Sequence, residues 1–316
     1  MEAKFQENNK VIVSIIMATY NREAFIEESL ASITNQSYTD WECIIIDDGG
    51  TDNTAKIIEP ILKKNRRFKY LSRTENYKKG LPGCRNMGLD QSSGEYIVFF
   101  DDDDIAHPDT LKIAVGQLKN SGLEYCRYLR QVFHGDFNLK FDKNLNFETQ
   151  LLDKSHIEEM ITGKLPFNSC QVLWSKTCFF NIRFNEDLMY AEEWECYSRI
   201  LMEGAKGVSV EKILYFGRKH PNSNTGEFRQ NNLTRKASKV HAVKLVIDNL
   251  KKHNLFKESL VKYFLRLGFQ IKEPEIIHYT LKKSDADVFK IMKYKIGYSF
   301  YPVIKPIFKL KSKLGK

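Results

Sequence analysis

The 316-residue sequence lacks long apolar runs. No stretch approaches the roughly 20 consecutive apolar residues that a membrane-spanning helix needs. The polar start, MEAKFQENNK, also lacks the apolar core of a secretory signal peptide. We therefore expect a cytoplasmic protein.

The sequence also lacks the cysteine spacings of a zinc site or a dithiol redox motif, because no two cysteines form a CxxC pair. Several cysteines stand in apolar segments, so packed, reduced thiols are expected rather than a disulfide framework. The six are Cys43, Cys84, Cys126, Cys170, Cys178 and Cys196.

Two glycine-rich phosphate motifs are missing as well. No GxGxxG follows the first apolar segment, and no GxxxxGK[ST] occurs anywhere in the chain. A dinucleotide fold of the usual kind and a P-loop are therefore unsupported. A diphosphate would have to be held through a metal ion.

The charge is unevenly distributed along the chain. Residues 227–316 carry 21 Lys and Arg against 7 Asp and Glu, a net +14, whereas residues 1–226 carry 28 against 33, a net −5. Length predicts about two domains, and we expect a domain over 1–226 and a helical, basic region over 227–316. The basic region favours a polyanionic partner.

Within the first hundred residues, apolar segments of strand length alternate with segments of helical spacing, which predicts a doubly wound parallel sheet. The expected strands are 11–17, 42–46, 68–71 and 96–100, with helices between them. Further on we expect a strand at 123–132, a loop at 134–153, a short strand at 168–174 with Trp174 in the core, a hairpin at 207–216, and helices at 233–253, 257–271, 274–283 and 286–294.

Two of these strands end in acidic loops. Asp47 and Asp48 follow the second strand, and GEYIVFFDDDD ends in the four carboxylates of residues 101–104. Open α/β sheets bind ligands at the carboxyl ends of their strands, and hard divalent cations prefer carboxylate oxygen. We therefore predict a cation at residues 101–104. The alternative is an acidic loop that only caps the helix started by Pro108.

These motifs carry a family resemblance. VSIIMATYNREAFIEESLASITNQSYTDWECIIIDDGGTDNT, GLPGCRNMGL and SGEYIVFFDDDDIAHPDTL resemble, in order and spacing, the family 2 glycosyltransferases of the GT-A fold. The resemblance covers about residues 11–225. It implies an α/β fold, with a mostly parallel, doubly wound sheet flanked by helices, and an inverting transfer from a nucleotide-sugar.

The resemblance also assigns the donor site. Asp48 would contact the nucleotide base, usually uracil, so a UDP-sugar is the expected donor. Arg85 would lie near the donor, unless it is a surface ion-pair residue, and Asp48 could instead cap a helix. The turn that lines the base pocket comprises Ala18, Thr19 and Tyr20. Gly50 stands where the family usually has serine, and we expect little effect of that change.

For the metal, the resemblance implies a DXD motif at residues 101–103 that holds Mn²⁺ or Mg²⁺. Asp103 would be the main ligand and Asp101 a second one, with Asp102 at the variable middle position beside the donor. His220 would add a nitrogen ligand, and Arg218 would pair with phosphate. The alternative for His220 is an ordinary surface histidine.

The catalytic base is expected at the start of a helix over 191–201, where Glu192 and Glu193 occupy the first turn. This segment resembles the family's ED motif, whose aspartate is the base, and Glu193 stands in that position. Glutamate is longer by one methylene, and a misplacement of about 1 Å can lower the rate about 100-fold. Glu192 and Asp187 are alternatives, and stabilisation by the helix dipole alone would also explain the glutamates.

The last segment, KIMKYKIGYSFYPVIKPIFKLKSKLGK, mixes aromatic residues, isoleucine and lysine and has no acidic residue. Pro302 and Pro306 exclude one long helix. The mixture suits an anionic membrane surface, so we expect peripheral association with the inner face of the cell membrane. No nucleic-acid motif accompanies the charge, and no nucleic acid partner is expected. A solvated basic surface is the alternative.

Together these features predict a metal-dependent, inverting glycosyltransferase. The donor would be a UDP-sugar, and the acceptor a saccharide, polyprenyl-linked, in surface polysaccharide biosynthesis. Two alternatives stay open. A receiver-like domain also carries aspartates at strand ends but needs a lysine pocket that we cannot place. A catalytically inactive sugar-nucleotide-binding or scaffold protein is suggested by glutamate at position 193.

Overall fold

A computed structural model describes residues 13–220 and 223–284, together with 286, 287, 289, 292, 294 and 296–298. The chain forms two compact units, one ending at Arg235 and the other starting at Lys236. The first unit extends beyond the expected boundary at 226. The reason is local, because the Phe228 ring stacks on Tyr190, with centroids 4.6 Å apart.

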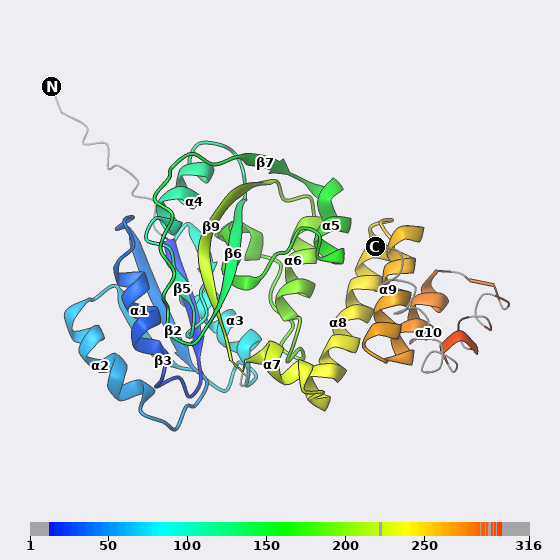
Figure 1. Ribbon diagram of the computed structural model, residues 1–316, viewed down its shortest axis with the longest axis horizontal. Coiled ribbons are helices and arrows are strands. Elements are labelled where there is room, and N and C mark those ends of the chain that lie inside the picture. Colours follow the sequence, from blue (N-terminus) through cyan, green and yellow to red (C-terminus); the bar gives the residue numbers. More distant parts are fainter. Residues whose placement is uncertain are drawn as a thin grey trace. The chain divides into compact units, whose positions relative to one another are not determined.

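The first unit alternates strands and helices (Figure 1). Its strands are β1 (Val13–Thr19), β2 (Trp41–Asp47), β3 (Phe68–Ser72), β4 (Tyr96–Phe99), β5 (Ile105–Ala106), β6 (Tyr125–His134), β7 (Thr149–Leu152), β8 (Val172–Ser175) and β9 (Gly207–Lys219). Its helices are α1 (Ile26–Thr34), α2 (Thr54–Lys64), α3 (Leu81–Gln91), α4 (Thr110–Leu118), α5 (Ile157–Thr162), α6 (Glu192–Met202) and α7 (Asn224–Arg229).

All nine strands join one sheet in the order β3-β2-β1-β4-β8-β6-β9-β5, with β7 paired to β9. The pairs among β1, β2, β3 and β4 are parallel, as is β6 with β9, whereas β8 runs antiparallel to both its neighbours. The predicted doubly wound, mostly parallel sheet is confirmed. Its first half brings the ends of β1, β2 and β4 to one edge.

Alternation along β1 explains why helices cover both faces of the sheet. Val13, Ile15 and Met17 belong to the same buried cluster as the apolar side of α1. Ile16 points the other way and meets α3, where a Cβ on Gly88 would lie 2.3 Å from Ile16 Cγ2. Successive side chains of a strand point to opposite faces, so the apolar residues from Val13 to Met17 of β1 are buried on both faces.

The expected hairpin at 207–216 is wrong, because β9 is one continuous strand of 13 residues. Its register against β6 shifts between Tyr128 and Arg130, where β9 carries extra residues at 211, 212 and 214. The polar pair Glu211-Lys212, which looked like a turn in the sequence, sits in this irregularity. The expected loop at 134–153 likewise contains β7, which pairs antiparallel with the first part of β9.

The second unit is helical. Helix α8 (Leu233–Lys252) leads into α9 (Glu258–Gln270) and α10 (Pro274–Lys283), which confirms three of the predicted helices. Val261 and Leu265 of α9 pack with Ile277 and Leu281 of α10. The helix expected at 286–294 lies partly outside the described residues, and the segment 299–316 lies wholly outside them. Among the described residues, no helix combines the length and hydrophobicity needed to cross a bilayer.

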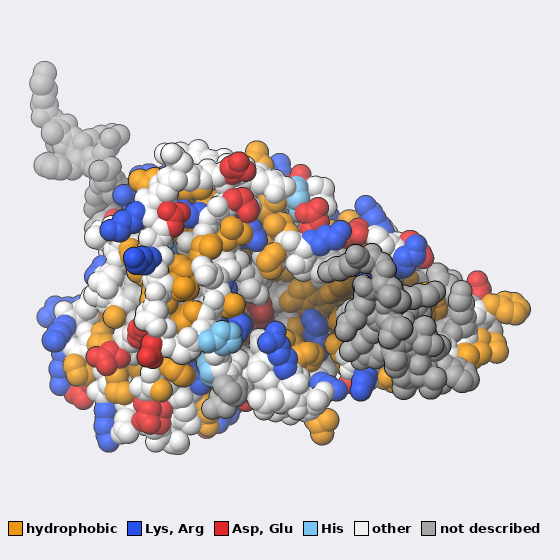
Figure 2. Space-filling view, in the orientation of Figure 1, with side chains coloured by type: hydrophobic (Ala, Val, Ile, Leu, Met, Phe, Trp, Pro, Cys, Tyr) orange, Lys and Arg blue, Asp and Glu red, His pale blue; other side chains and the backbone are white. Residues whose placement is uncertain are grey.

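Charged side chains of both signs are interspersed over the described part of the face in Figure 2, rather than gathered by sign. Hydrophobic, acidic and basic groups lie next to one another there. Charge selection by the first unit must therefore be sought in local arrangements such as the cleft described below.

Helix α3 depends on a close approach at Gly83, where a Cβ would lie 2.0 Å from the Lys78 carbonyl oxygen. We expect Gly83→Ala to lower the free energy of unfolding by about 2–3 kcal/mol, since backbone must move to relieve the overlap. Gly116→Ala in α4 is the matched control. Its Cβ meets nothing within 4 Å, so we expect a gain of about 0.5–1 kcal/mol. Urea unfolding measures both, and equal effects would contradict the packing account.

Candidate active site

A cleft of about 780 Å³ opens where β1, β2 and β4 end. It brings together the residues that the sequence assigned to the donor, the metal and the base, apart from His220, which contacts one of them. Those that line the cleft are Ala18, Thr19, Tyr20, Asp48, Arg85, Asp101, Asp102, Asp103, Glu193 and Arg218.

Asp48 is held rigidly at one side of the cleft. Its carboxylate accepts hydrogen bonds from Arg73 Nε at 2.5 Å and from the Gly80 backbone N–H at 2.9 Å. Asp47 accepts bonds from its own turn instead, and the first turn of α2 is bonded by Asp52. The helix-capping alternative for Asp48 is therefore wrong. Its fixed carboxylate can accept a hydrogen bond from a ligand.

Tyr20 stands at the mouth of the cleft on the same side. Its side chain is 43% exposed, and Lys79 Nζ lies 5.0 Å from the ring centroid. An exposed aromatic face next to a cation suits a planar base attached to phosphate.

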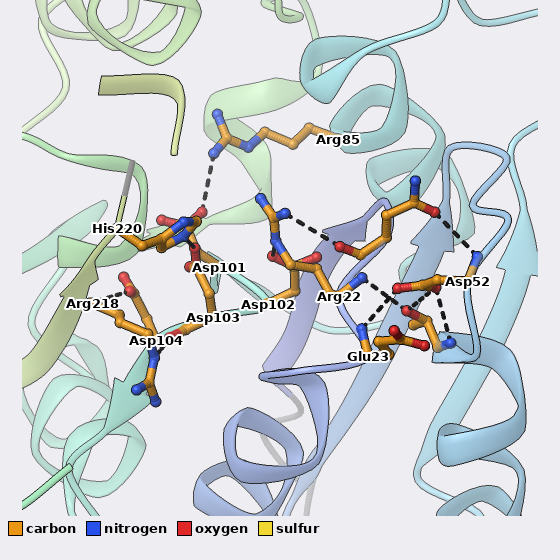
Figure 3. A network of polar contacts seen from close by, with 12 residues as sticks. Arg22, Glu23, Asp52, Arg85, Asp101, Asp102, Asp103, Asp104, Arg218 and His220 are labelled. Atoms are coloured by element: carbon orange, nitrogen blue, oxygen red, sulfur yellow. Dashed lines mark hydrogen bonds and ion pairs between the residues drawn. The ribbon is translucent and has the colours of Figure 1, made fainter. Parts of the chain in front are cut away.

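The four consecutive aspartates have four different sets of partners (Figure 3). Asp102 pairs with Arg22 Nε at 3.0 Å, Asp103 with His220 Nε2 at 2.7 Å, and Asp104 with Arg130 Nη2 at 3.2 Å; Asp101 lies 3.6 Å from Arg85 Nη2. Helix α4 begins after Asp109, and no side-chain bond caps it. The alternative that this loop only caps a helix is therefore wrong.

The pKa values of these carboxyl groups are shifted in different directions. Burial raises the pKa of Asp102 to about 7 and raises the pKa of Asp104 well above its usual value, in each case against a neighbouring arginine. Burial acts on Asp103 in the same direction, but the hydrogen bond from His220 and the charge of Arg22 outweigh it, and the pKa of Asp103 is lowered. Asp103 therefore ionises more readily than Asp102 or Asp104.

The side chains predicted to bind the metal suit a divalent ion in their chemistry. Asp103 and His220 touch, and the Asp101 side chain is 33% exposed at the cleft, so two carboxylates and an imidazole are available. Mn²⁺ accepts these ligand types. In the described part of the chain, the ligand atoms that lie within 4.8 Å of one another are those of Asp101, Asp104 and Cys170, so the predicted set of Asp101, Asp103 and His220 is not brought within that distance. Burial raises the pKa of the Cys170 thiol, and a protonated thiol is a poor ligand.

Arg85 is buried, so the surface ion-pair alternative is wrong. Its guanidinium lies 2.9 Å from Glu192 Oε1 and 3.6 Å from Asp101 Oδ1, and it packs on the rings of Phe99 and Phe184. The side chain therefore links the end of β4 to the start of α6.

This ion pair separates the candidates for the base. Glu192 is buried against Arg85, and Asp187 is an exposed residue paired with Lys78 at 2.5 Å. Glu193 lines the cleft, and no ion pair of Glu193 occurs among the described residues. The preceding Ala191 has a left-handed backbone with φ of 65°, which costs a residue with a Cβ about 1 kcal/mol. Such strain often marks a functional segment.

Arg218 has partners other than the phosphate expected for it. Its Nε donates to the Asp103 carbonyl oxygen at 2.9 Å, and its two terminal nitrogens bond to Gly135 O and Glu28 Oε2. Its own backbone N–H donates to Asp104 Oδ1 at 2.7 Å. In this arrangement Arg218 braces the acidic loop.

The sequence analysis missed five cations of the cleft wall, of which Arg235 pairs with Glu227. Arg22 and Lys79 lie on the side of Asp48, and Arg130 and Lys219 lie toward β6 and β9. Lys219 stands between Arg218 and His220, two residues predicted for the site, and this position was a usable signal that Lys219 lines the cleft. Arg130 stands in a strand whose pattern shows only burial, so the sequence holds no signal for it.

Comparison with known proteins agrees with this geometry. A family model described as Glycosyl transferase family 2 matches residues 14–185. A curated Campylobacter jejuni protein, GalNAc(5)-diNAcBac-PP-undecaprenol beta-1,3-glucosyltransferase, is 31% identical over 72% of this chain and 68% of its own length. An Escherichia coli protein, UDP-Glc:alpha-D-GlcNAc-diphosphoundecaprenol beta-1,3-glucosyltransferase WfgD, is 36% identical over 36% of this chain and 44% of its own.

Among solved structures, the fold is similar to that of S. aureus TarS residues 1–349 in complex with UDP-GlcNAc. The TM-score is 0.61, with 18% identity, over 93% of this chain and 92% of the other. At that identity the likeness concerns the fold, and it confirms the expected GT-A architecture.

The Arg85–Glu192 pair provides a test of stability. We expect Arg85→Met to lower the free energy of unfolding by about 3–5 kcal/mol, because Glu192 is left buried without its cation. Adding Glu192→Gln should recover at least about 1 kcal/mol, a coupling that a double-mutant cycle by urea unfolding measures. The same cycle on the exposed pair of Lys78 and Asp187 serves as control and should give less than about 1 kcal/mol. Similar coupling energies would contradict the buried-link assignment.

Proposed function

The chain belongs to glycosyl transferase family 2 and is a glycosyltransferase; from this premise we propose a specific reaction. It transfers a sugar from a UDP-sugar to a hydroxyl of a saccharide acceptor, with a divalent ion bound, and inverts the anomeric carbon. The observation that carries the proposal is the cleft itself, where the fixed carboxylate of Asp48, Asp103 with its contact to His220, and Glu193 occur together.

The nucleotide would bind at the β1 and β2 side of the cleft. Asp48 would accept a hydrogen bond from the base, since Arg73 and the Gly80 N–H already hold its carboxylate in place. Tyr20 and Lys79 would cover the base and the adjoining phosphate. Asp48 stands next to Thr19, whose carbonyl oxygen accepts the Asp48 N–H at 2.9 Å, so both sides of the pocket are tied together.

Asp101, Asp103 and His220 would hold Mn²⁺ or Mg²⁺. When bound, the ion supplies Lewis-acid stabilisation of the charge on the departing diphosphate. The loop is prepared for this task, because Arg218 fixes the Asp103 backbone and Asp104 anchors the Arg218 backbone.

Glu193 would take the proton of the acceptor hydroxyl as that oxygen attacks the anomeric carbon. A single displacement of this kind inverts the anomeric centre. Arg85 forms an ion pair with the adjacent Glu192, so Glu193 would be the carboxylate that faces the acceptor. The strained Ala191 fixes where α6 begins and thus where Glu193 points.

The acceptor would be a saccharide linked to a polyprenyl diphosphate, in surface polysaccharide biosynthesis. The names of the C. jejuni and E. coli relatives both specify undecaprenol-linked saccharides joined through diphosphate. In this chain, Phe289, Met292 and Ile296 recur at helical spacing and are 85%, 53% and 54% exposed. With the surrounding lysines they would seat the second unit on an anionic membrane at the cytoplasmic face.

A panel of UDP-, GDP- and dTDP-sugars with Mn²⁺ tests the reaction. We expect turnover, as hydrolysis or transfer, with a UDP-sugar, and loss of it when the ion is removed by chelation. Asp103→Asn should abolish the response to Mn²⁺, because it removes a charged ligand. Failure of every donor to bind or turn over with Mn²⁺ would sink the proposal.

Glu193→Gln discriminates an enzyme from an inactive binding protein. We expect kcat to fall by about 100-fold or more, while the affinity for UDP and Mn²⁺, measured by calorimetry, stays the same. Glu192→Gln is the matched control, and its main effect should be on stability through Arg85. UDP binding without turnover in the unaltered chain would favour the scaffold alternative.

Membrane association is tested by sedimentation with vesicles. The chain should bind phosphatidylglycerol vesicles more strongly than phosphatidylcholine vesicles. Replacing Phe289, Met292 and Ile296 by serine should weaken binding about tenfold or more, since about 25 cal/mol is lost per Å² of apolar area. Phe180→Ser, at an apolar side chain of the first unit that is 64% exposed, should have no effect. Equal binding by all variants would contradict this assignment.

A further inference from the structure

Charge pairing in the cleft leaves two cations over. Every arginine in the cleft wall forms an ion pair with a carboxylate. Each carboxylate lies on another structural element or in a distant part of the sequence. The pairs are Arg22–Asp102, Arg85–Glu192, Arg130–Asp104, Arg218–Glu28 and Arg235–Glu227. Lys79 and Lys219 also line the cleft, and no ion pair of either lysine occurs in the described ranges.

The two lysines stand on opposite sides of the acidic loop. In the sheet, β4 lies between the β1–β2 side and the β6–β9 side. Lys79 lies over Tyr20 on the nucleotide side, whereas Lys219 is the last residue of β9. Lys79 is exposed, but Lys219 is only partly exposed. A half-buried ammonium without a counter-ion is unfavourable unless a ligand supplies one.

Arg130 adds a second cation on the β9 side. It comes from β6 at the register shift beside Tyr128, and such irregularities redirect side chains near active sites. Its guanidinium lies against the backbone of Gly217, where a Cβ would be only 1.6 Å from Arg130 Nη2. Arg130 Nε is buried and has no hydrogen-bond partner among the described residues.

Lys219 and Arg130 both line the cleft, and the Arg130 guanidinium lies against Gly217, two residues before Lys219 in β9. Asp104, 3.2 Å from Arg130 Nη2, pairs with that one cation. Two like charges on one cleft wall can bind an anion. Because Asp101 and Asp103 lie between this wall and the nucleotide pocket, the anion belongs on the acceptor side.

We propose that Lys219 and Arg130 bind an anionic group of the acceptor, a phosphate or a carboxylate next to the acceptor sugar. The proposal rests on the proposed glycosyl transfer and deepens it. The enzyme would then select acceptors by charge as well as by the sugar, and Lys219 would be a specificity-determining residue. The sugar hydroxyl would be held between this anion site and Glu193.

The kinetic test compares three forms of one acceptor sugar with the active donor: an alkyl diphosphate, a neutral alkyl glycoside and an alkyl uronoside. The unaltered enzyme should prefer an anionic form in kcat/KM over the neutral glycoside. Lys219→Gln should reduce this preference at least about tenfold, as for a lost charged hydrogen bond. If Lys219→Gln lowers kcat/KM more for the alkyl diphosphate, the group is a phosphate; if more for the alkyl uronoside, it is a carboxylate.

Lys79→Gln is the matched control, because it removes the other unpaired lysine, and the acceptor preference should stay within about twofold. A preference that survives Lys219→Gln, or none in the unaltered enzyme, would overturn the proposal. If Lys219→Gln raised only the KM for the donor, the proposal would also be overturned, and Lys219 would be assigned to donor binding.

Binding separates this proposal from the proposed function. With saturating UDP and Mg²⁺, calorimetry should show methyl diphosphate binding to the unaltered protein, weakened about tenfold by Lys219→Gln and unchanged by Lys79→Gln. This holds even if every donor fails to react, in which case glycosyl transfer is contradicted and the anion site stands. Transfer that proceeds normally without such binding would contradict only the anion site.

Discussion

The site depends on one electrostatic constraint, the placement of four consecutive carboxyls at the end of β4, of which Asp102, Asp103 and Asp104 are buried. Like charges at this spacing raise one another's pKa and resist burial, so each carboxyl needs its own positive partner. The partners come from the turn after β1, from β6, from α3 and from the end of β9. One run of aspartates thereby ties elements far apart in the chain to a single edge of the sheet. The rest of the cleft is arranged around these ties.

The features visible in the sequence are those with a local cause. The sheet follows from apolar segments of strand length separated by helical spacing, and the acidic loops at residues 47–48 and 101–104 follow from carboxylates placed after such strands. The choice of Asp48 and Asp103 within these loops came from the family resemblance. Glu193 was likewise assigned by resemblance to the family's ED motif, and the structure places it in the first turn of α6. For His220, the family-like segment at residues 218–220 was signal enough, and the structure places the ring against Asp103.

The remaining features depend on contacts between distant positions, which no local pattern records. Arg85 and Glu192 are 107 residues apart in the sequence. No local pattern around either residue therefore indicates that the two form an ion pair. The family resemblance led us to expect Arg218 at a phosphate. Its backbone bond to Asp104 and its side-chain bond to Asp103 could not be foreseen, since they exist only in the folded chain. The expected hairpin at 207–216 is wrong because Glu211-Lys212 has the composition of a turn, whereas pairing with β6 and β7 keeps the strand continuous.

Strand β9 also bears on how such a chain can change in length. Its last residues alternate in direction, so one inserted residue just before them would exchange the faces of Arg218 and Lys219. The extra residues at 211, 212 and 214 already break the register with β6. An insertion or deletion there can be absorbed without moving the strand end. A change of length near Glu211 and Lys212 would therefore disturb the cleft less than one between Tyr215 and Lys219, at the end of β9.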